Sequence, residues 1–339
     1  MATDVRPVAA SVDELLRGAT HREPLVGGDG KSGVALERVT IDGAGYVLKH
    51  LHHRDDWIMR ATGDLVGRPI TLWRTGLLDQ LPGSIDHATV GAAWEERSGG
   101  RGGAILMRDV GEWLVPEGSG PFPRDQDERF LDHMAELHAA FWGFPDTPGL
   151  FDVSTRYVWF GPRLAATELA LGGTNPVPTT LVPDGWARFP TRARRSAALV
   201  QALLDDPGPL VRALAATPRT LVHGDWKAGN LGSHRDGRTI LLDWALPGPG
   251  PPCSDLSFYL CLNRARLPRP KEDTCVAYRE ALERRGIDTG PWWERQLALC
   301  LLGTLLQFGW EKSLGDGDDA GAELDWWDRK AAEGGRLLT

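Results

Sequence analysis

The chain has 339 residues, of which 42% are apolar and 25% charged, and its formal net charge is −8. This length allows a sizeable core in one large domain or two modest ones. The negative charge argues against non-specific binding to nucleic acid or to anionic membranes. No apolar run approaches the length of a membrane span, and residues 1–6 carry no apolar signal region. Four cysteines without a Cys-x-x-Cys spacing predict neither a zinc site nor a redox pair, and they fit a reducing cytoplasm.

The N-terminal third predicts a small sheet with helices. A short helix is expected over 11–17, followed by a glycine-rich stretch at 25–33. Residues 34–40 and 45–51 then form two strands joined by an Asp-Gly turn, which is a hairpin signal. Further along, the pattern predicts two helices and then a second pair of strands, at 54–66, 70–80, 89–95 and 104–107.

The middle of the chain predicts a helical region. Residues 127–142 place apolar side chains at helical spacing, so they form a helix with a buried stripe, and His138 is expected to be a satisfied core histidine. Residues 145–190 are rich in Gly, Pro and Thr and are expected to be irregular. Two more helices are expected at 191–204 and 210–216.

Two short apolar runs are each followed closely by an aspartate. The run ending at Val222 leads to Asp225, and Ile240 to Leu242 leads to Asp243. The polar stretch between them reads as a tight connection, and Asn230 follows Asp225 by five residues. We therefore expect an acid, an amide oxygen and a second acid to converge.

This set of groups suits phosphoryl transfer. One carboxylate can orient and deprotonate an attacking hydroxyl, while carboxylate and amide oxygens are ligands that Mg²⁺ prefers. His-x-Asp-x-x-x-x-Asn, followed by a strand that ends in Asp, is also the pattern of a kinase catalytic loop and metal loop. The alternative is two strands with solvated acidic ends.

His223-Gly224-Asp225 with Asn230, and then Asp243-Trp244, resembles the aminoglycoside phosphotransferase and choline kinase group of small-molecule kinases. The resemblance implies an α+β, two-lobed, protein-kinase-like fold. Its small N-terminal lobe has an antiparallel sheet and binds nucleotide, over residues 1–108. Its mostly helical C-terminal lobe carries catalysis and substrate binding, over residues 109–339.

The resemblance also implies roles for individual residues. Asp225 is the expected catalytic base and His223 orients its loop. Asn230 and Asp243 hold Mg²⁺ against the phosphates of ATP. Lys49, on a strand that follows the glycine-rich stretch, is the expected phosphate-pairing lysine, although a surface lysine on an edge strand is the alternative.

An acid is expected to pair with Lys49, and two positions are candidates. Asp64 is fifteen residues on, close to the usual interval in the resembled family, although that family more often has Glu there and Gly63 breaks the helical pattern. Asp56 is the second candidate. The inter-lobe strand and hinge by resemblance include Arg108 and Val110, whose main-chain groups would hold the adenine.

Gly28, Gly30 and Ser32 in the glycine-rich stretch are the candidate phosphate contacts, since glycine lets backbone N–H groups approach closely. Gly30-Lys31-Ser32 could also end a P-loop. That pattern requires glycine at position 25, which is Leu25, and a following helix, whereas a strand is expected.

Beyond Trp244 a Pro-Gly-rich segment is incompatible with a helix or a central strand, and helices are expected at 254–262, 272–285, 292–313 and 322–337. Asp255 matches a family acid that braces the catalytic loop. Because the family's C-terminal helices line the acceptor pocket, Trp226, Trp292, Trp310 and Glu311 are candidate substrate contacts, with core packing as the alternative.

The expected function is an ATP-dependent kinase that transfers the γ-phosphate to a hydroxyl of a small molecule, with Mg²⁺ as cofactor and neither nucleic acid nor a membrane as partner. One alternative is a non-catalytic, kinase-like, nucleotide-binding regulator, and another is a scaffolding protein. The acceptor, the choice between ATP and GTP, and the oligomeric state stay open.

Overall fold

The computed structural model describes residues 6–25, 33–65, 67–97 and 100–338 of the chain. The chain folds into two compact units, each assembled from two stretches of sequence. The first unit comprises residues 1–119 and 227–247, and the second comprises residues 120–226 and 248–339. The boundary predicted after Arg108 falls inside the first unit, because the hinge segment and the hairpin that follows Trp226 pack with the N-terminal elements.

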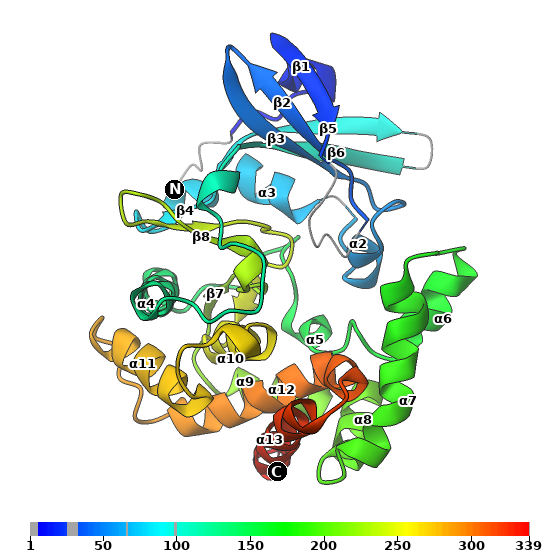
Figure 1. Ribbon diagram of the computed structural model, residues 1–339, viewed down its shortest axis with the longest axis vertical. Coiled ribbons are helices and arrows are strands. Elements are labelled where there is room, and N and C mark those ends of the chain that lie inside the picture. The colour runs from blue at the N-terminus through cyan, green and yellow to red at the C-terminus, as the bar shows by residue number, and fades with distance from the viewer. Residues whose placement is uncertain (1–5, 26–32, 66, 98–99, 339) are drawn as a thin grey trace. The chain divides into compact units, whose positions relative to one another are not determined.

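The first unit is built on a five-stranded antiparallel sheet with the order β1-β2-β3-β6-β5 (Figure 1). Its strands are β1 (Ala19–Pro24), β2 (Leu36–Ile41), β3 (Ala44–Leu51), β5 (Thr89–Arg97) and β6 (Gly100–Arg108). The four strands expected here are confirmed. Strand β1 was not predicted, because four of its six residues are polar and five are exposed, so they carry no apolar alternation.

Helices cover this sheet and complete two apolar clusters. Val12 of α1 (Val12–Leu15) packs with Val39 and Leu48. In the second cluster, Ile70 and Trp73 of α3 (Arg68–Arg74) pack with residues of β5 and β6. Figure 1 shows α3 lying along these strands. The sheet is therefore anchored by side chains from segments that flank it in sequence.

The predicted helices at 54–66 and 70–80 are shorter than expected. Helix α2 (Trp57–Ala61) begins only after Asp56, whose carboxylate caps it, and the chain turns at Gly63, where φ is +64°. Helix α3 gives way to Gly76 at φ +69° and a single 3₁₀ turn, η1 (Leu78–Gln80). Both breaks use the left-handed conformation that glycine adopts without a steric penalty.

A second, three-stranded sheet in the first unit has the order β4-β9-β8. Strands β8 (Leu231–Ser233) and β9 (Thr239–Leu241) form the hairpin expected from the tight polar connection. Strand β4 (Ile85–Asp86) pairs with β9 in parallel, and this contact was not predicted.

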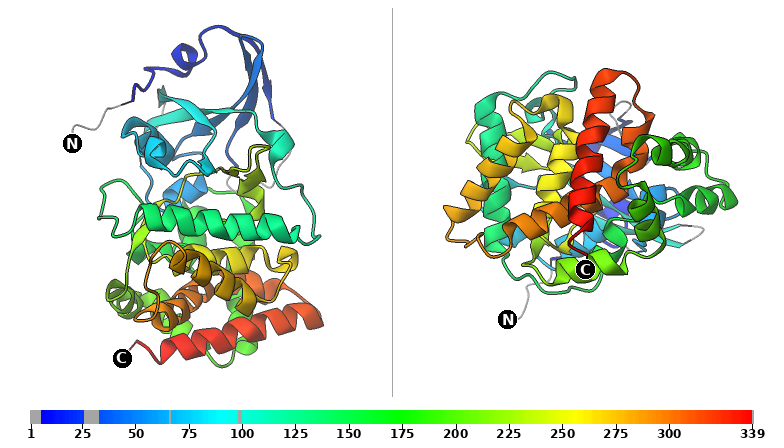
Figure 2. Two further views of the ribbon diagram at one scale, coloured as in Figure 1. Left: turned by 90° about the vertical axis from the view of Figure 1, so that its left-hand side faces the viewer. Right: turned by 90° about the horizontal axis from the view of Figure 1, so that it is seen from below.

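The second unit is mainly helical. Its helices are α4 (Arg124–Ala140), α5 (Val153–Arg156), α6 (Arg163–Ala170), α7 (Val182–Arg192), α8 (Ala197–Asp205), α9 (Gly208–Ala215), α10 (Cys253–Leu262), α11 (Lys271–Glu283), α12 (Trp293–Leu314) and α13 (Asp318–Gly335). A two-stranded ladder joins β7 (Thr220–Val222) to β10 (Gly248–Gly250). In Figure 2, α13 is the red helix, which packs along α12.

The prediction that residues 145–190 are irregular was wrong. This region contains α5, α6, a π-helical turn (Val177–Leu181) and most of α7. Trp186 and Phe189 of α7 are buried, and α7 packs on α12 so closely that Gly185 faces the Trp310 carbonyl. Tertiary burial therefore supplies the helical preference that a composition rich in Gly, Pro and Thr lacks.

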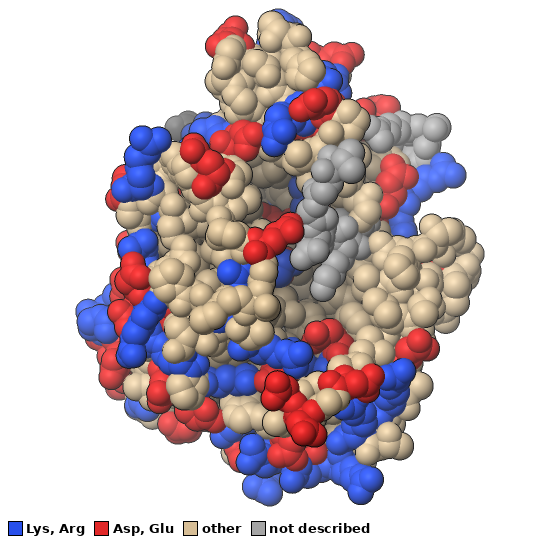
Figure 3. Space-filling model, viewed as in Figure 1, with Lys and Arg blue, Asp and Glu red and all other residues tan. Residues whose placement is uncertain are grey.

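Among the described helices, none combines the length and the apolarity needed to span a membrane. On the face drawn in Figure 3, acidic and basic side chains are interspersed. The net charge of −8 is therefore not gathered into one acidic patch on that face.

Candidate functional site

The predicted site residues are distributed over both units. Those of the first unit are Lys49, Asp56, Asp64, Arg108, Val110, Asn230 and Asp243. Those of the second unit are His223, Asp225, Trp226, Trp292, Trp310 and Glu311. Gly28, Gly30 and Ser32 lie outside the described residues.

In the second unit, the motif His223-Gly224-Asp225 begins where β7 ends. Gly224 has φ +80°, a conformation that favours glycine, and it turns the chain between His223 and Asp225. The Asp225 N–H donates to His223 Nδ1 at 3.2 Å, and both residues are buried. The imidazole of His223 is therefore part of the turn that presents Asp225.

Asp255 holds this turn from behind. Its two carboxylate oxygens accept the backbone N–H groups of His223 and Gly224, each at 2.7 Å. Burial alone would raise the pKa of this fully buried carboxyl, but the hydrogen bond and charge of His138, with the neighbouring donors, lower the pKa of Asp255 below its ordinary value. Asp255 is therefore a carboxylate that accepts two charge-assisted bonds from the loop.

His138 and Tyr278 extend this contact into the core. His138 Nε2 lies 3.1 Å from Asp255 Oδ2, and His138 Nδ1 lies 2.5 Å from the Tyr278 hydroxyl. The Thr220 hydroxyl, on β7, donates to the His138 carbonyl at 2.7 Å. The prediction that His138 is a satisfied core histidine is confirmed. Sequence reasoning missed Tyr278, because nothing local marks a tyrosine of α11 as a neighbour of α4.

In the first unit, Asn230 and Asp243 lie on the two arms of one hairpin. Asn230 ends the 3₁₀ turn η4 (Ala228–Asn230), and its carbonyl accepts the N–H of Leu242 at 2.9 Å. Asp243 follows with φ +60°, which is unusual for a residue other than glycine. Backbone strain of this kind concentrates at functional positions, where the surrounding fold enforces it.

Strand β3 brings Lys49 to this carboxylate. Lys49 Nζ lies 2.6 Å from Asp243 Oδ1, and the side chains are 15% and 33% exposed. The charges of Lys49 and Asp243 also act on Asp56. Burial raises the pKa of Asp56 to about 6, the charge of Lys49 opposes this rise, and the charge of Asp243 adds to it. The lysine of the predicted nucleotide site and the predicted metal-binding acid thus meet within one unit.

Asp64 and Asp56 both have structural contacts of their own. Asp64 accepts the N–H groups of Gly67 and Arg68, at 2.9 and 2.8 Å, and so caps the start of α3. Asp56 accepts the N–H groups of Ile58 and Met59 at the start of α2. The pairing of Lys49 with either acid stays a prediction.

The predicted hinge follows β6. The Arg108 N–H donates to the Ala88 carbonyl at 2.9 Å, and contact of the Arg108 main chain with adenine stays a prediction. Val110 is buried and packs with Ala88 and Ile240.

The three candidate tryptophans are buried in the second unit. Trp226 meets His223 edge to face, Trp292 contacts the rings of Trp142 and Trp293, and Trp310 contacts Phe160. The Glu311 carboxylate is 40% exposed and lies 3.1 Å from Lys312. The rings pack in the core, while the buried indole N–H groups of Trp226 and Trp310 have no hydrogen-bond partner among the described residues. Contact with an acceptor stays a prediction.

Comparison with known proteins supports the fold. No curated protein sequence matches the chain. The choline kinase LicA from Streptococcus pneumoniae superposes with a TM-score of 0.52 at 14% identity, covering 95% of this chain and 96% of the other. For a microcompartment-associated aminopropanol kinase the TM-score is 0.51 at 15% identity, covering 93% of this chain and 90% of the kinase. For a thermostable mutant of aminoglycoside phosphotransferase APH(4)-Ia, in a ternary complex with ADP and hygromycin B, it is 0.50 at 12% identity, with 96% of each covered.

These similarities confirm the α+β, protein-kinase-like fold. The model of the family described as "Phosphotransferase enzyme family" (APH) matches residues 95–289, which is more than half of the chain and includes the motif from His223 to Asp243. The chain therefore belongs to this phosphotransferase family.

Proposed function

We propose that the protein is an ATP-dependent kinase that transfers the γ-phosphate to a hydroxyl group of a small molecule. The observation that carries this proposal is the 2.6 Å contact between Lys49 and Asp243 beside the hairpin of Asn230. A cation and hard oxygen donors are the groups that a Mg²⁺-bound triphosphate requires. Membership of a phosphotransferase family supports the reaction class.

Asn230 and Asp243 fit a magnesium ion in donor chemistry and in placement. One offers an amide oxygen and the other a carboxylate, and the bond from Leu242 N–H to the Asn230 carbonyl fixes their backbones beside each other. Mg²⁺ usually binds through one or two protein oxygens, with phosphates and water completing its shell. When bound, the ion would neutralise phosphate oxygens.

Lys49 would position and neutralise the phosphates, because its ammonium is the cation already next to the metal-binding acid. Asp64, or Asp56 as the second candidate, would pair with Lys49. The Arg108 carbonyl and the Val110 N–H would hold the adenine. The functional division into 1–108 for nucleotide and 109–339 for catalysis and acceptor remains part of this proposal.

Asp225 would accept the proton of the attacking hydroxyl and orient its oxygen toward the γ-phosphorus. A base that aligns a nucleophile must itself be rigid, since small misplacements lower the rate steeply. The hydrogen bonds that the backbone N–H groups of His223 and Gly224 donate to the Asp255 carboxylate support such rigidity.

The test is Mg²⁺-dependent release of ADP from ATP over a panel of hydroxyl compounds. The panel includes choline, aminopropanol and hygromycin B, which the names of the structural neighbours mention. Asp225→Ala should lower turnover by at least ~10²-fold, as expected for loss of a general base. Asp319→Ala, at an exposed acid near the start of α13, is the matched control and should leave turnover unchanged.

Stimulation by one class of acceptor, lost in Asp225→Ala, would support the kinase and name the class. Binding of Mg·ATP without stimulation by any acceptor would favour the nucleotide-binding regulator. Lack of nucleotide binding by the folded protein would refute both proposals and leave a scaffolding role.

A further inference from the structure

Asp86 is a buried carboxylate that neither the motif nor the proposed mechanism uses. It ends the two-residue strand β4 and lies opposite Ile240 of β9, the strand that leads to Asp243. Only 4% of its surface is exposed. A buried carboxylate is costly unless charged or hydrogen-bonding groups surround it, so its neighbours indicate why it is there.

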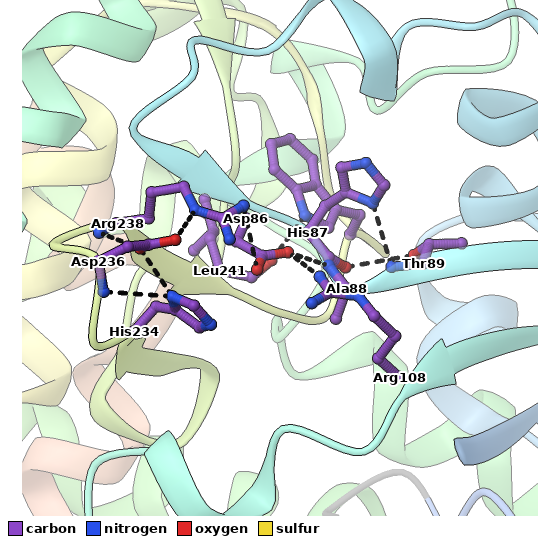
Figure 4. A network of polar contacts seen from close by, with 10 residues as sticks. Asp86, His87, Ala88, Thr89, Arg108, His234, Asp236, Arg238 and Leu241 are labelled. Carbon is purple, nitrogen blue, oxygen red and sulfur yellow. Dashed lines mark hydrogen bonds and ion pairs between the residues drawn. The ribbon is translucent and has the colours of Figure 1, made fainter. Parts of the chain in front are cut away.

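Three segments converge on this carboxylate (Figure 4). Asp86 Oδ1 accepts the Ala88 N–H at 3.0 Å and a hydrogen bond from the Arg108 guanidinium. Arg238 Nη1 lies 3.4 Å from Asp86 Oδ2. Ala88 has φ +55°, and the bond from its N–H to the Asp86 side chain is the kind that stabilises such a turn.

The two arginines belong to the hinge and to the hairpin that leads to the proposed metal ligands. Arg108 is the last residue of β6 and enters the hinge, where its own N–H is held by the Ala88 carbonyl. Arg238 immediately precedes β9, and its N–H and Nε both donate to Asp236, at 3.1 and 2.9 Å. Asp86 therefore connects the adenine end to the hairpin that carries the metal ligands.

A second set of contacts joins the same two segments beyond the hinge. The Val115 N–H donates to the Leu231 carbonyl at 2.8 Å, next to Asn230. The ring of Trp113 lies 3.8 Å from that of His234, measured between centroids, and Asp236 contacts His234 at 2.7 Å. The hinge segment and the hairpin are thus fastened on both sides of the adenine-binding positions.

We propose that Asp86 is a positioning residue that sets the spacing between the adenine end and the phosphate end of the nucleotide site. This inference rests on the proposed function. ATP and ADP are ligands of limited reach, so their two ends bind together best when both subsites are held at a matching separation. Preorganisation of this kind increases affinity for the whole ligand without adding a contact.

The test compares a whole nucleotide with its two halves. Affinities for Mg·ADP, adenosine and Mg·pyrophosphate are measured by calorimetry for the wild type and for Asp86→Asn. We expect the affinity for Mg·ADP to fall about tenfold, within the range typical of coupling between sites, while both fragments keep their wild-type affinities. A purely structural role would lower the melting temperature and leave all three affinities of the folded protein unchanged.

Arg238→Met provides a second variant, because this side chain is 35% exposed and its loss leaves the bonds of Asp86 to Ala88 and Arg108 in place. It should reproduce the selective loss of Mg·ADP affinity, and the double variant should lose less than the sum of the single changes. Asp79→Asn is the matched control, since it breaks the Arg6–Asp79 ion pair in the same unit. It should leave the three affinities unchanged.

Equal Mg·ADP affinity in the wild type and in both folded variants would overturn the inference about Asp86 while leaving the kinase proposal intact. An equal loss of affinity for Mg·ADP and for either fragment would also overturn it, because one subsite would then be damaged directly. Wild-type protein that binds none of the three ligands would instead refute the proposed function.

Discussion

Replacing Asp255 with asparagine should separate the rigidity of the catalytic loop from its chemistry. The side chain keeps its shape but loses its charge and one of its two acceptor oxygens. Only one of the N–H groups of His223 and Gly224, both held at 2.7 Å, can then be satisfied. The other would face the amide NH₂ group in a fully buried environment.

The magnitude follows from these contacts. A hydrogen bond to a charged group contributes about 1.5–3 kcal/mol, and a buried donor without a partner costs about 1–3 kcal/mol. Removing the charge also relieves its desolvation penalty, so the terms do not simply add. We expect a loss of about 3–5 kcal/mol in the free energy of unfolding, the size found when one partner of a buried charged pair is removed.

The assays are urea unfolding and Mg²⁺-dependent release of ADP from ATP, measured on the folded variant well below its melting temperature. Because the turn that presents Asp225 loses one of its two anchors, kcat should fall by about 10²-fold, as expected for a misplacement near 1 Å. The affinity for Mg·ADP should not change, because Asp255 contacts the loop backbone in the second unit.

Asp127→Asn is the control for this experiment. Asp127 is equally buried in the second unit and interacts with the Tyr259 hydroxyl at 2.7 Å and with Arg269 at 2.9 Å. It should lower stability and leave kcat unchanged. Wild-type kcat in Asp255→Asn, or an equal fall in kcat in Asp127→Asn, would refute the bracing role.

Three further changes test other parts of the molecule. Lys49→Met should weaken Mg·ADP binding in calorimetry, since it removes the cation beside Asp243; unchanged affinity would contradict the nucleotide-binding role. Because burial raises the pKa of Asp56 to about 6, the Asp56 carboxyl binds a proton more tightly in the folded state than in the unfolded chain. Stability should therefore fall by roughly 3 kcal/mol as the pH rises from about 4 to 6, and Asp56→Asn should remove that slope in urea unfolding. Gly185→Ala would place a methyl group 2.2 Å from the Trp310 carbonyl oxygen, which should cost at least about 1–3 kcal/mol in urea unfolding. Gly321→Ala, in open space, should not destabilise the protein.

Local sequence signals predicted a large part of the fold. The hairpin of β2 and β3 follows from two apolar runs around an Asp-Gly turn, and the antiparallel pairing of the two strands confirms it. The long helices of the second unit follow from helical periodicity. The motif from His223 to Asp243 predicted the protein family, because its characteristic residues all lie within one stretch of 21 positions.

Composition misled the prediction where tertiary contacts decide the structure. Helices α6 and α7 form because apolar side chains on them, such as Leu164 of α6 and Trp186 and Phe189 of α7, are buried in the second unit. Strand β1 forms because β2 offers it an open edge, although its own side chains carry no strand signal. In both regions the stabilising partner lies outside the segment itself.

Linear motifs predict which chemical groups the protein presents: an acid and an amide in one loop, a second acid after the next strand, and a lysine on a strand near the N-terminus. The contacts that hold these groups arise only from folding. Tyr278 and Asp255 reach His138 across 140 and 117 residues of chain, and Lys49 reaches Asp243 across 194. Side chains so distant in sequence meet only when helices and sheets pack, and their spacing along the chain carries no record of that contact.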